Sequence, residues 1–211
     1  MKKITTIFLS LTLWLSLSIS QAAETKFIVD DPGGRNNVEF ISKAPIENII
    51  GVTNLVTGSI TFDPENLQNN AFGKIQVDLR TLNSGIELRD EHMRSEKYLN
   101  TQKFPFATFV FDSPVETGIL NLKPGETISI SLKGKFDLHG ITKDIVIQGD
   151  ASLYNAVKEL AEYGYPGEMF NFDGHFKVKL QDFNINRPEF LIMKLAEEQQ
   201  IHINFTATTG R

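Results

Sequence analysis

Hydrophobic and polar residues alternate along most of this 211-residue chain. A period of two is typical of β-strands that bury one face and expose the other. The alternation is clear at Ile75, Val77 and Leu79, which are separated by amide and charged residues. About eight such segments follow one another, so the pattern predicts a protein made mostly of antiparallel strands.

Two stretches depart from this alternation. Residues 44–51 contain Pro45, and we expect an irregular segment there because proline is excluded from central strands. Residues 155–167 predict a loop with one helical turn over 156–162.

One charged helix is predicted between two strands, at about residues 85–97. Ser84 and Glu87 have the spacing of a capping box, in which each side chain satisfies a backbone donor at a helix N-terminus. The helix should therefore begin near residue 85. One narrow, inward-facing apolar stripe is predicted on this otherwise charged segment by Ile86, Met93 and Tyr98.

Amphipathic strands with so little helix must hide their apolar faces by closing or by stacking. Closure also removes exposed sheet edges. We therefore predict an all-β fold, an eight-stranded antiparallel barrel, with a two-sheet sandwich as the alternative. An eight-stranded barrel can be filled by side chains or can hold one small ligand. The pattern leaves both interiors open.

The N-terminus predicts the cellular compartment of the protein. Lys2 and Lys3 precede an apolar run, and Ser20 and Ala22 are small residues at the positions that signal peptidase recognises. The run is too short, and too rich in Ser and Thr, for a membrane span. We predict a signal peptide at 1–22, a single domain at 23–211 and export to the periplasm. Cysteine is absent, so stability must come from packing.

The predicted mature chain is acidic. Loss of Lys2 and Lys3 leaves 19 basic and 26 acidic residues, a net charge of −7. Binding to nucleic acid needs clustered Lys and Arg, so this balance argues against a nucleic-acid partner. It also disfavours anionic membrane surfaces, and we expect no stable membrane insertion. Both a monomer and a homodimer stay open.

No enzyme class is indicated by the motifs, since the chain has no nucleophile elbow, P-loop or dinucleotide fingerprint. Arg89, Asp90, His92 and Arg94 form the densest cluster of functional groups, and a histidine beside carboxylates can act as an acid or base. A solvated helix face that pairs its own charges is the simpler interpretation. The four histidines lack metal-ligand spacing, so we predict neither a metal nor a cofactor.

Phenylalanine dominates the predicted interior face. Its ring adds bulk without a polar group that needs a partner, which suits a filled core and an apolar ligand equally well. The alternation directs these phenylalanines inward: Phe40, Phe62, Phe109, Phe111, Phe136, Phe172 and Phe176.

Several runs resemble the YceI-like family of periplasmic polyisoprenoid-binding proteins. The longest is IELRDEHMRSEKYLNTQKFPFATFVF at 86–111, and ITFDP at 60–64, FDLHGITK at 136–143 and FKVKLQDFNI at 176–185 agree with later strands of that family. The chain departs from the family around Asn36 and Ala44, where histidines are usual.

The resemblance implies a lipocalin-like barrel with its helix near the mouth and an apolar tunnel for a prenyl quinone or a polyprenyl phosphate. On this hypothesis the chain sequesters or transports an isoprenoid lipid and is not an enzyme. The residues expected at the tunnel entrance or beside the lipid headgroup are Arg89, Asp90, His92 and Arg94. The expected tunnel residues are Phe40, Phe62, Ile75, Val77, Leu79, Met93, Tyr98, Phe104, Phe109, Phe111, Phe136, Leu138, Phe172 and Phe176.

Two other functions stay open. A ligand-free, stress-related interaction or scaffold protein would have a filled barrel, and its functional surface would be the helix and the 155–167 loop. An enzyme would depend on His92 or Asp90.

Overall fold

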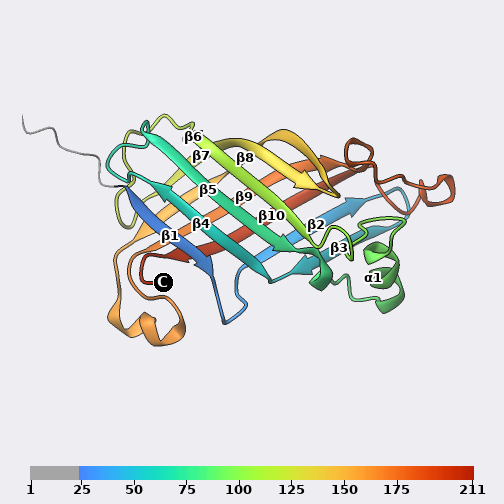
Figure 1. Ribbon diagram of the computed structural model, residues 1–211, viewed down its shortest axis with the longest axis horizontal. Helices are drawn as coiled ribbons and strands as arrows, with labels where there is room; N and C mark the ends of the chain where they lie inside the picture. The colour runs from blue at the N-terminus through green and yellow to red at the C-terminus, as the bar shows by residue number, and fades with distance from the viewer. Residues whose placement is uncertain (1–23) are drawn as a thin grey trace, which may run out of the picture.

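The computed structural model describes residues 24–211, with only the backbone of residues 70 and 114. The strands form one antiparallel sheet that curls into an elongated barrel, with α1 at one end (Figure 1). The predicted signal peptide at 1–22 lies outside the described residues. The elements are β1 (Thr25–Asp30), β2 (Asn37–Lys43), β3 (Asn48–Thr53), β4 (Val56–Phe62), β5 (Asn70–Asp78), η1 (Leu79–Thr81), α1 (Glu87–Arg94), β6 (Phe106–Pro114), β7 (Thr127–Leu138), β8 (Ile141–Tyr154), η2 (Lys158–Tyr163), β9 (Met169–Lys179), η3 (Leu180–Phe183), η4 (Glu189–Leu191) and β10 (Glu198–Thr208).

Eight of the ten strands close the barrel, in the order β1-β4-β5-β6-β7-β8-β9-β10, and β10 returns to β1 where Ile28 faces Thr208. The β2–β3 hairpin extends the sheet on the same strand, because β10 pairs with β2 over Gln200–Asn204. Strands β1 and β2 therefore lie end to end along β10. The predicted eight-stranded antiparallel barrel is confirmed.

Asn36 occupies the seam between β1 and β2. Its side chain is buried, and its Oδ1 accepts a hydrogen bond from the backbone N–H of Thr206 at 2.9 Å. Its carbonyl accepts another from Asn54 Nδ2 at 3.2 Å. A buried backbone N–H without a partner is costly. By satisfying the Thr206 N–H, Asn36 allows β10 to change its pairing partner from β1 to β2.

Strand β3 contradicts the prediction of an irregular segment at 44–51. Pro45 lies in the loop before β3, and β3 is a terminal strand of the sheet that pairs along its length with β2 alone. Gly51 obscured the strand pattern. A Cβ at this position would lie 2.2 Å from the Phe40 ring, so a close contact rather than strand propensity determines the residue.

Helix α1 begins two residues later and ends three residues earlier than predicted. Gly85 has a φ of +82°, which is outside helical geometry and delays the start. The predicted capping box is wrong, because the N-cap residue Ile86 makes no side-chain cap bond. Instead, Asp90 accepts hydrogen bonds from the backbone N–H of Ser84, at 2.8 Å, and from its hydroxyl.

The 155–167 segment contains a single short helix, η2, in agreement with the predicted loop and helical turn. Within residues 24–211, no helix has the length and apolar character needed to cross a bilayer.

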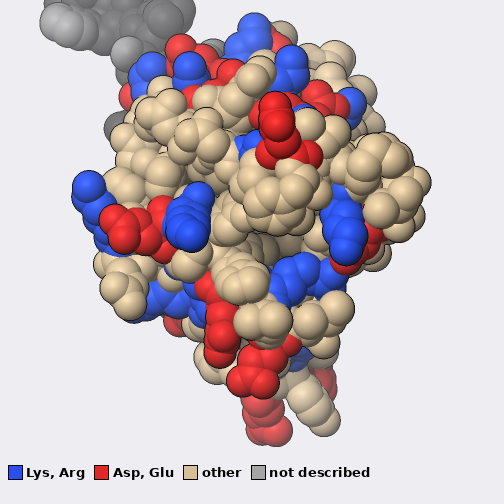
Figure 2. All heavy atoms as spheres, turned by 90° about the vertical axis from the view of Figure 1, so that its right-hand side faces the viewer, with Lys and Arg blue, Asp and Glu red and all other residues tan. Residues whose placement is uncertain are grey.

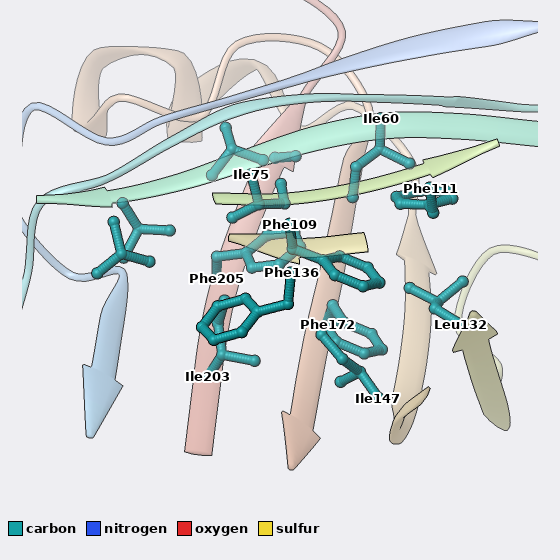
Figure 3. Close-up of a cluster of buried hydrophobic side chains, with 14 of the residues drawn as sticks. Ile60, Ile75, Phe109, Phe111, Leu132, Phe136, Ile147, Phe172, Ile203 and Phe205 are labelled. Carbon is teal, nitrogen blue, oxygen red and sulfur yellow. The ribbon is translucent and has the colours of Figure 1, made fainter. Parts of the chain in front are cut away.

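The barrel is filled at the end opposite α1. Phe27, Phe62 and Phe170 pack there with ring centroids 5.1–5.8 Å apart. The gap that remains has a volume of about 20 Å³, close to the space of one water molecule. Figure 3 shows Ile60, Phe111 and Leu132 pointing into the interior from different strands. This end is a close-packed core.

A surface clamp holds the β1–β2 turn against the η2 segment. Asp31 accepts hydrogen bonds from the Arg35 guanidinium and from two backbone N–H groups, and its side chain is 2% exposed. Arg35 also donates to the carbonyl of Tyr163 at 2.7 Å and stacks over the Tyr165 ring. These hydrogen bonds lower the pKa of the Asp31 carboxyl far below its usual range, although burial opposes them.

We predict that Phe62→Ala lowers the free energy of unfolding by about 3–5 kcal/mol, because it leaves a void in a filled core. Phe40→Ala should cost only about 1–2 kcal/mol, since Phe40 is half-buried and lies at the other end of the barrel. Urea unfolding followed by circular dichroism measures both values. Equal losses would contradict the unequal packing of the two ends.

We also predict that the stabilisation supplied by Asp31 disappears in acid. A depressed folded-state pKa contributes stability above the unfolded value of about 3.9 and loses it as pH falls through the folded value. The difference in melting temperature between the wild type and Asp31→Asn should therefore be largest near pH 7 and shrink steadily below about pH 4. A difference that stays constant down to pH 2 would contradict this role.

Candidate ligand-binding cavity

The α1 half of the barrel is hollow. Its interior holds a cavity of about 330 Å³, and most of its lining side chains are apolar. Protein interiors are normally packed without voids larger than a water molecule. An apolar cavity of roughly 150 Å³ already takes up a benzene molecule, so this one has room for about ten to twelve carbon atoms.

The cavity ends where the two halves of the barrel meet. Phe109 and Phe136 are directly opposed on β6 and β7, and both line the cavity. Phe172 and Phe205 lie beyond the cavity in the filled half, with ring centroids 5.7 Å apart. Figure 3 shows these four rings in one continuous cluster. The filled half thus forms the floor of the cavity.

The mouth lies at the α1 end, where Figure 2 shows a hollow surrounded mainly by uncharged residues. Met93 of α1 and Tyr98 and Leu99 after it form one side. The segment between β9 and β10 forms another, with Ile185 and Leu191 among its lining residues. The walls are completed by inward side chains of β2, β5 to β10 and the edge strand β3.

Arg89 is the best-connected polar group at the mouth. Its Nη1 forms an ion pair with Glu47 Oε1 at 3.0 Å, which links α1 to the β2–β3 loop. Its Nε donates to Ser84 Oγ at 2.7 Å, and its Nη2 donates to the Ser84 carbonyl at 2.9 Å. Ser84 in turn donates to the buried carboxylate of Asp90. The network holds α1 beside the opening and leaves Arg89 with donors to spare.

Three further polar side chains line the cavity. Lys194 and His92 are exposed at the mouth, and among the described residues neither side chain forms an ion pair. Gln199 is 5% exposed, and its amide nitrogen donates to the Ala196 carbonyl at 2.6 Å. Its Oε1 has no hydrogen-bond partner within the described part of the chain. Apart from these groups and the Thr53 hydroxyl, the lining is apolar below the mouth.

Twelve of the predicted site residues line this one cavity. The two from the helix cluster, Arg89 and His92, lie at its mouth. The other ten are Phe40, Ile75, Val77, Leu79, Met93, Tyr98, Phe109, Phe136, Leu138 and Phe176.

Six predicted site residues lie elsewhere. Phe62, Phe111 and Phe172 point inward but belong to the filled half. Phe104 packs against the ring of His139, with centroids 4.8 Å apart. The two polar ones have local partners: Asp90 accepts from Ser84, and Arg94 Nη1 donates to the carbonyl of Leu82 at 2.8 Å.

Many lining residues were missed by the sequence reasoning. Alternation marks Ile201 and Ile203 on β10 and Val178 on β9 as inward, so their pattern could have identified them. No periodic signal marks Glu47 or Lys194, because both lie in irregular segments. The others that line the cavity are Val38, Ile49, Thr53, Leu82, Leu99, Ala107, Ile147, Leu180, Ile185, Leu191, Leu195 and Gln199.

The histidines form no metal centre in the described structure. Between residues 24 and 211, no three His, Asp or Glu side chains come together as ligands for an ion. His202 instead pairs with Asp173 at 2.6 Å on the exposed faces of β10 and β9.

Solved structures share this fold. A polyisoprenoid-binding domain from Saccharophagus degradans aligns with 87% of this chain and 98% of its own, at 16% identity and a TM-score of 0.64. BcnA from Burkholderia cenocepacia aligns with 85% of this chain and all of its own, at 18% identity and a TM-score of 0.63. Identities this low establish a common fold and no more.

Sequence comparisons establish the family. A UPF0312 protein of Azotobacter vinelandii is 31% identical over 176 residues, which cover 81% of this chain and 82% of that protein. A UPF0312 protein of Photorhabdus laumondii is 29% identical over 171 residues, 81% of each chain. The model of the YceI-like domain matches residues 31–207, nearly all of the barrel. The chain therefore belongs to the YceI-like family.

Proposed function

We propose that this protein is an exported carrier that holds the chain of an isoprenoid lipid, such as a prenyl quinone or a polyprenyl phosphate, in its cavity. The observation that carries the proposal is the apolar hollow in one half of a barrel whose other half is close-packed. Its volume is within the range of ligand sites, roughly 300–1,000 Å³. The polyisoprenoid-binding name of the Saccharophagus degradans domain supports the same class of ligand.

The energetics favour a carrier over a ligand-free scaffold. An empty cavity of this size leaves its apolar walls without packing partners or in contact with water that enters through the mouth, and both states are unfavourable. Burying roughly ten CH2 groups of a lipid contributes about 8 kcal/mol before ordering costs. The chain thus stabilises the protein by filling the space that side chains leave.

The mouth supports a polar headgroup at the surface. Arg89, His92 and Lys194 can donate hydrogen bonds there, whereas the floor formed by Phe109 and Phe136 offers none. The lipid would enter with its hydrocarbon end first. The headgroup of a chain of about two isoprene units would lie beside α1, and a longer chain would extend beyond the mouth. Discrimination by chain length should be weak, since one methylene more or less changes binding to an apolar wall only slightly.

The predicted signal peptide at 1–22 supports action outside the cytoplasm, in the periplasm. A carrier is useful in that compartment because exposure of the apolar surface of an isoprenoid chain to water is unfavourable, and a protein cavity shields that surface. Catalysis is not required for this role, and the cluster around Arg89 serves to position α1 and the headgroup.

The proposal is tested by mass spectrometry of an organic extract from protein exported through its own signal peptide and purified without detergent. We expect an isoprenoid lipid at close to one molecule per protein. A lipid-free extract from folded protein that also fails to take up added geraniol, an isoprenoid alcohol small enough for the cavity, would contradict the carrier function.

Ala107→Phe should abolish this lipid while the barrel still folds. Ala107 is a small inward residue of β6 that lines the cavity, so a phenylalanine ring there would occupy the ligand's space. Val110→Phe places the same ring on the exposed face of the same strand and should retain the lipid. Native mass spectrometry compares both variants. Equal lipid content would contradict binding in the cavity, and Ala107→Leu repeats the test if the larger ring prevents folding.

A further inference from the structure

Five large apolar side chains at the mouth face solvent, and we call them the apolar rim. Each is adjacent in sequence to a residue that lines the cavity. Their exposure is high, with Phe190 at 79%, Ile46 at 65% and Leu88 at 62%. Apolar chains scattered singly need no explanation, whereas a group around one opening indicates an interaction site. The rim consists of Ile46, Leu88, Phe190, Ile192 and Met193.

The rim is assembled from three segments that hold one another in place. The backbone N–H of Ile46 donates to the carbonyl of Met193 at 3.0 Å, which joins the β2–β3 loop to the segment before β10. The ion pair between Glu47 and Arg89 joins the same loop to α1. Because these contacts fix the segments, binding through the rim requires little further ordering.

Charges around the rim are of both signs. Figure 2 shows separate basic and acidic groups around the hollow rather than a field of one sign. The charged residues directly adjacent to the rim in sequence are three acidic and two basic, a net charge of −1 that offers no attraction to anionic lipid. They are Glu47, Glu87, Arg89, Glu189 and Lys194.

We propose that the apolar rim docks the protein reversibly onto the surface of a lipid bilayer, with the cavity mouth facing the membrane. The inference rests on the proposed function, because an isoprenoid ligand resides in a bilayer before it is taken up. Insertion of the rim would give the lipid chain an apolar path from the bilayer into the cavity. The lack of net positive charge means that burial of the rim, and not attraction to anionic lipid, supplies the affinity.

A bilayer fits this surface better than a protein partner does. Stable protein interfaces need a continuous, complementary patch of about 800 Å² on each partner. The rim side chains stand on three separate segments around a hollow, which provides no such face. Single apolar side chains can each enter the boundary between lipid headgroups and tails without any shape match.

Vesicle flotation tests the docking. The purified protein is mixed with vesicles of phosphatidylcholine and phosphatidylethanolamine, with or without phosphatidylglycerol. The test variant is Phe190→Ser with Met193→Ser, two exposed residues that do not line the cavity. The matched control is Val157→Ser with Tyr163→Ser, which removes two exposed apolar side chains at the η2 segment, far from α1 (Figure 1).

We expect the wild type and the control variant to float with the vesicles. The rim variant should bind the vesicles about tenfold less, because it lacks two apolar side chains that would be partly buried in the bilayer. Phosphatidylglycerol or 0.5 M salt should change binding less than twofold. Flotation that is absent in the wild type, that survives the rim substitutions or that depends on anionic lipid would overturn the proposal.

Two companion measurements separate the remaining explanations. Geraniol uptake reports on the cavity alone. Uptake without flotation contradicts docking and leaves the carrier function standing. Rim-dependent flotation without uptake supports docking and contradicts the carrier function. Analytical ultracentrifugation detects self-association. A dimer that the rim substitutions dissociate, in a protein that does not float, would make the rim a contact between two copies and overturn bilayer docking.

Discussion

The architecture depends on one strand, β10, that pairs with two others end to end. Its C-terminal end faces β1 and closes the barrel, whereas its N-terminal half pairs with β2. Asn36 makes this exchange of partners tolerable, because its side chain satisfies the Thr206 N–H that lies between the two pairings. Without that exchange the β2–β3 hairpin would have no place beside β10, and the barrel would end at its filled half.

The two pairings of β10 also determine how tightly each half of the barrel is packed. Aromatic rings from β1, β4 and β9 meet in the closed half and leave almost no free volume. In the extended half, β3 is held by β2 on one side. On the other side it is held by a bridge between Val52 and Asn83 and by hydrogen bonds between the Thr53 hydroxyl and residues Asp78 and Thr81. The wall is completed there by α1 and by the segment that precedes β10. The strands supply most of the lining, α1 and this segment cover the remaining side, and the space between them is the cavity.

Polar interactions are concentrated where this irregular wall needs them. The hydrogen bonds from Ser84 to Asp90 and from Arg89 to Ser84, together with the ion pair to Glu47, hold α1 against the β2–β3 loop. Asp90 is buried, and its carboxyl group is satisfied by the N–H and the hydroxyl of Ser84. The same residues that suggested acid–base chemistry in the sequence are therefore explained by the positioning of α1 at the mouth.

The sequence by itself determined most of the strands and the approximate position of the helix, and it favoured a barrel over a sandwich, because alternation and apolar content depend on neighbouring residues. It also directed Phe40, Phe109 and Phe136 inward. Tertiary structure alone decided which half is hollow, since Phe62 and Phe109 follow the same alternation but only one faces free space. It likewise decided the role of Asp90, the strand character around Gly51 and the contribution of Glu47 and Lys194 to the mouth. These features depend on contacts between segments far apart in the chain, and such contacts leave no periodic trace in the sequence.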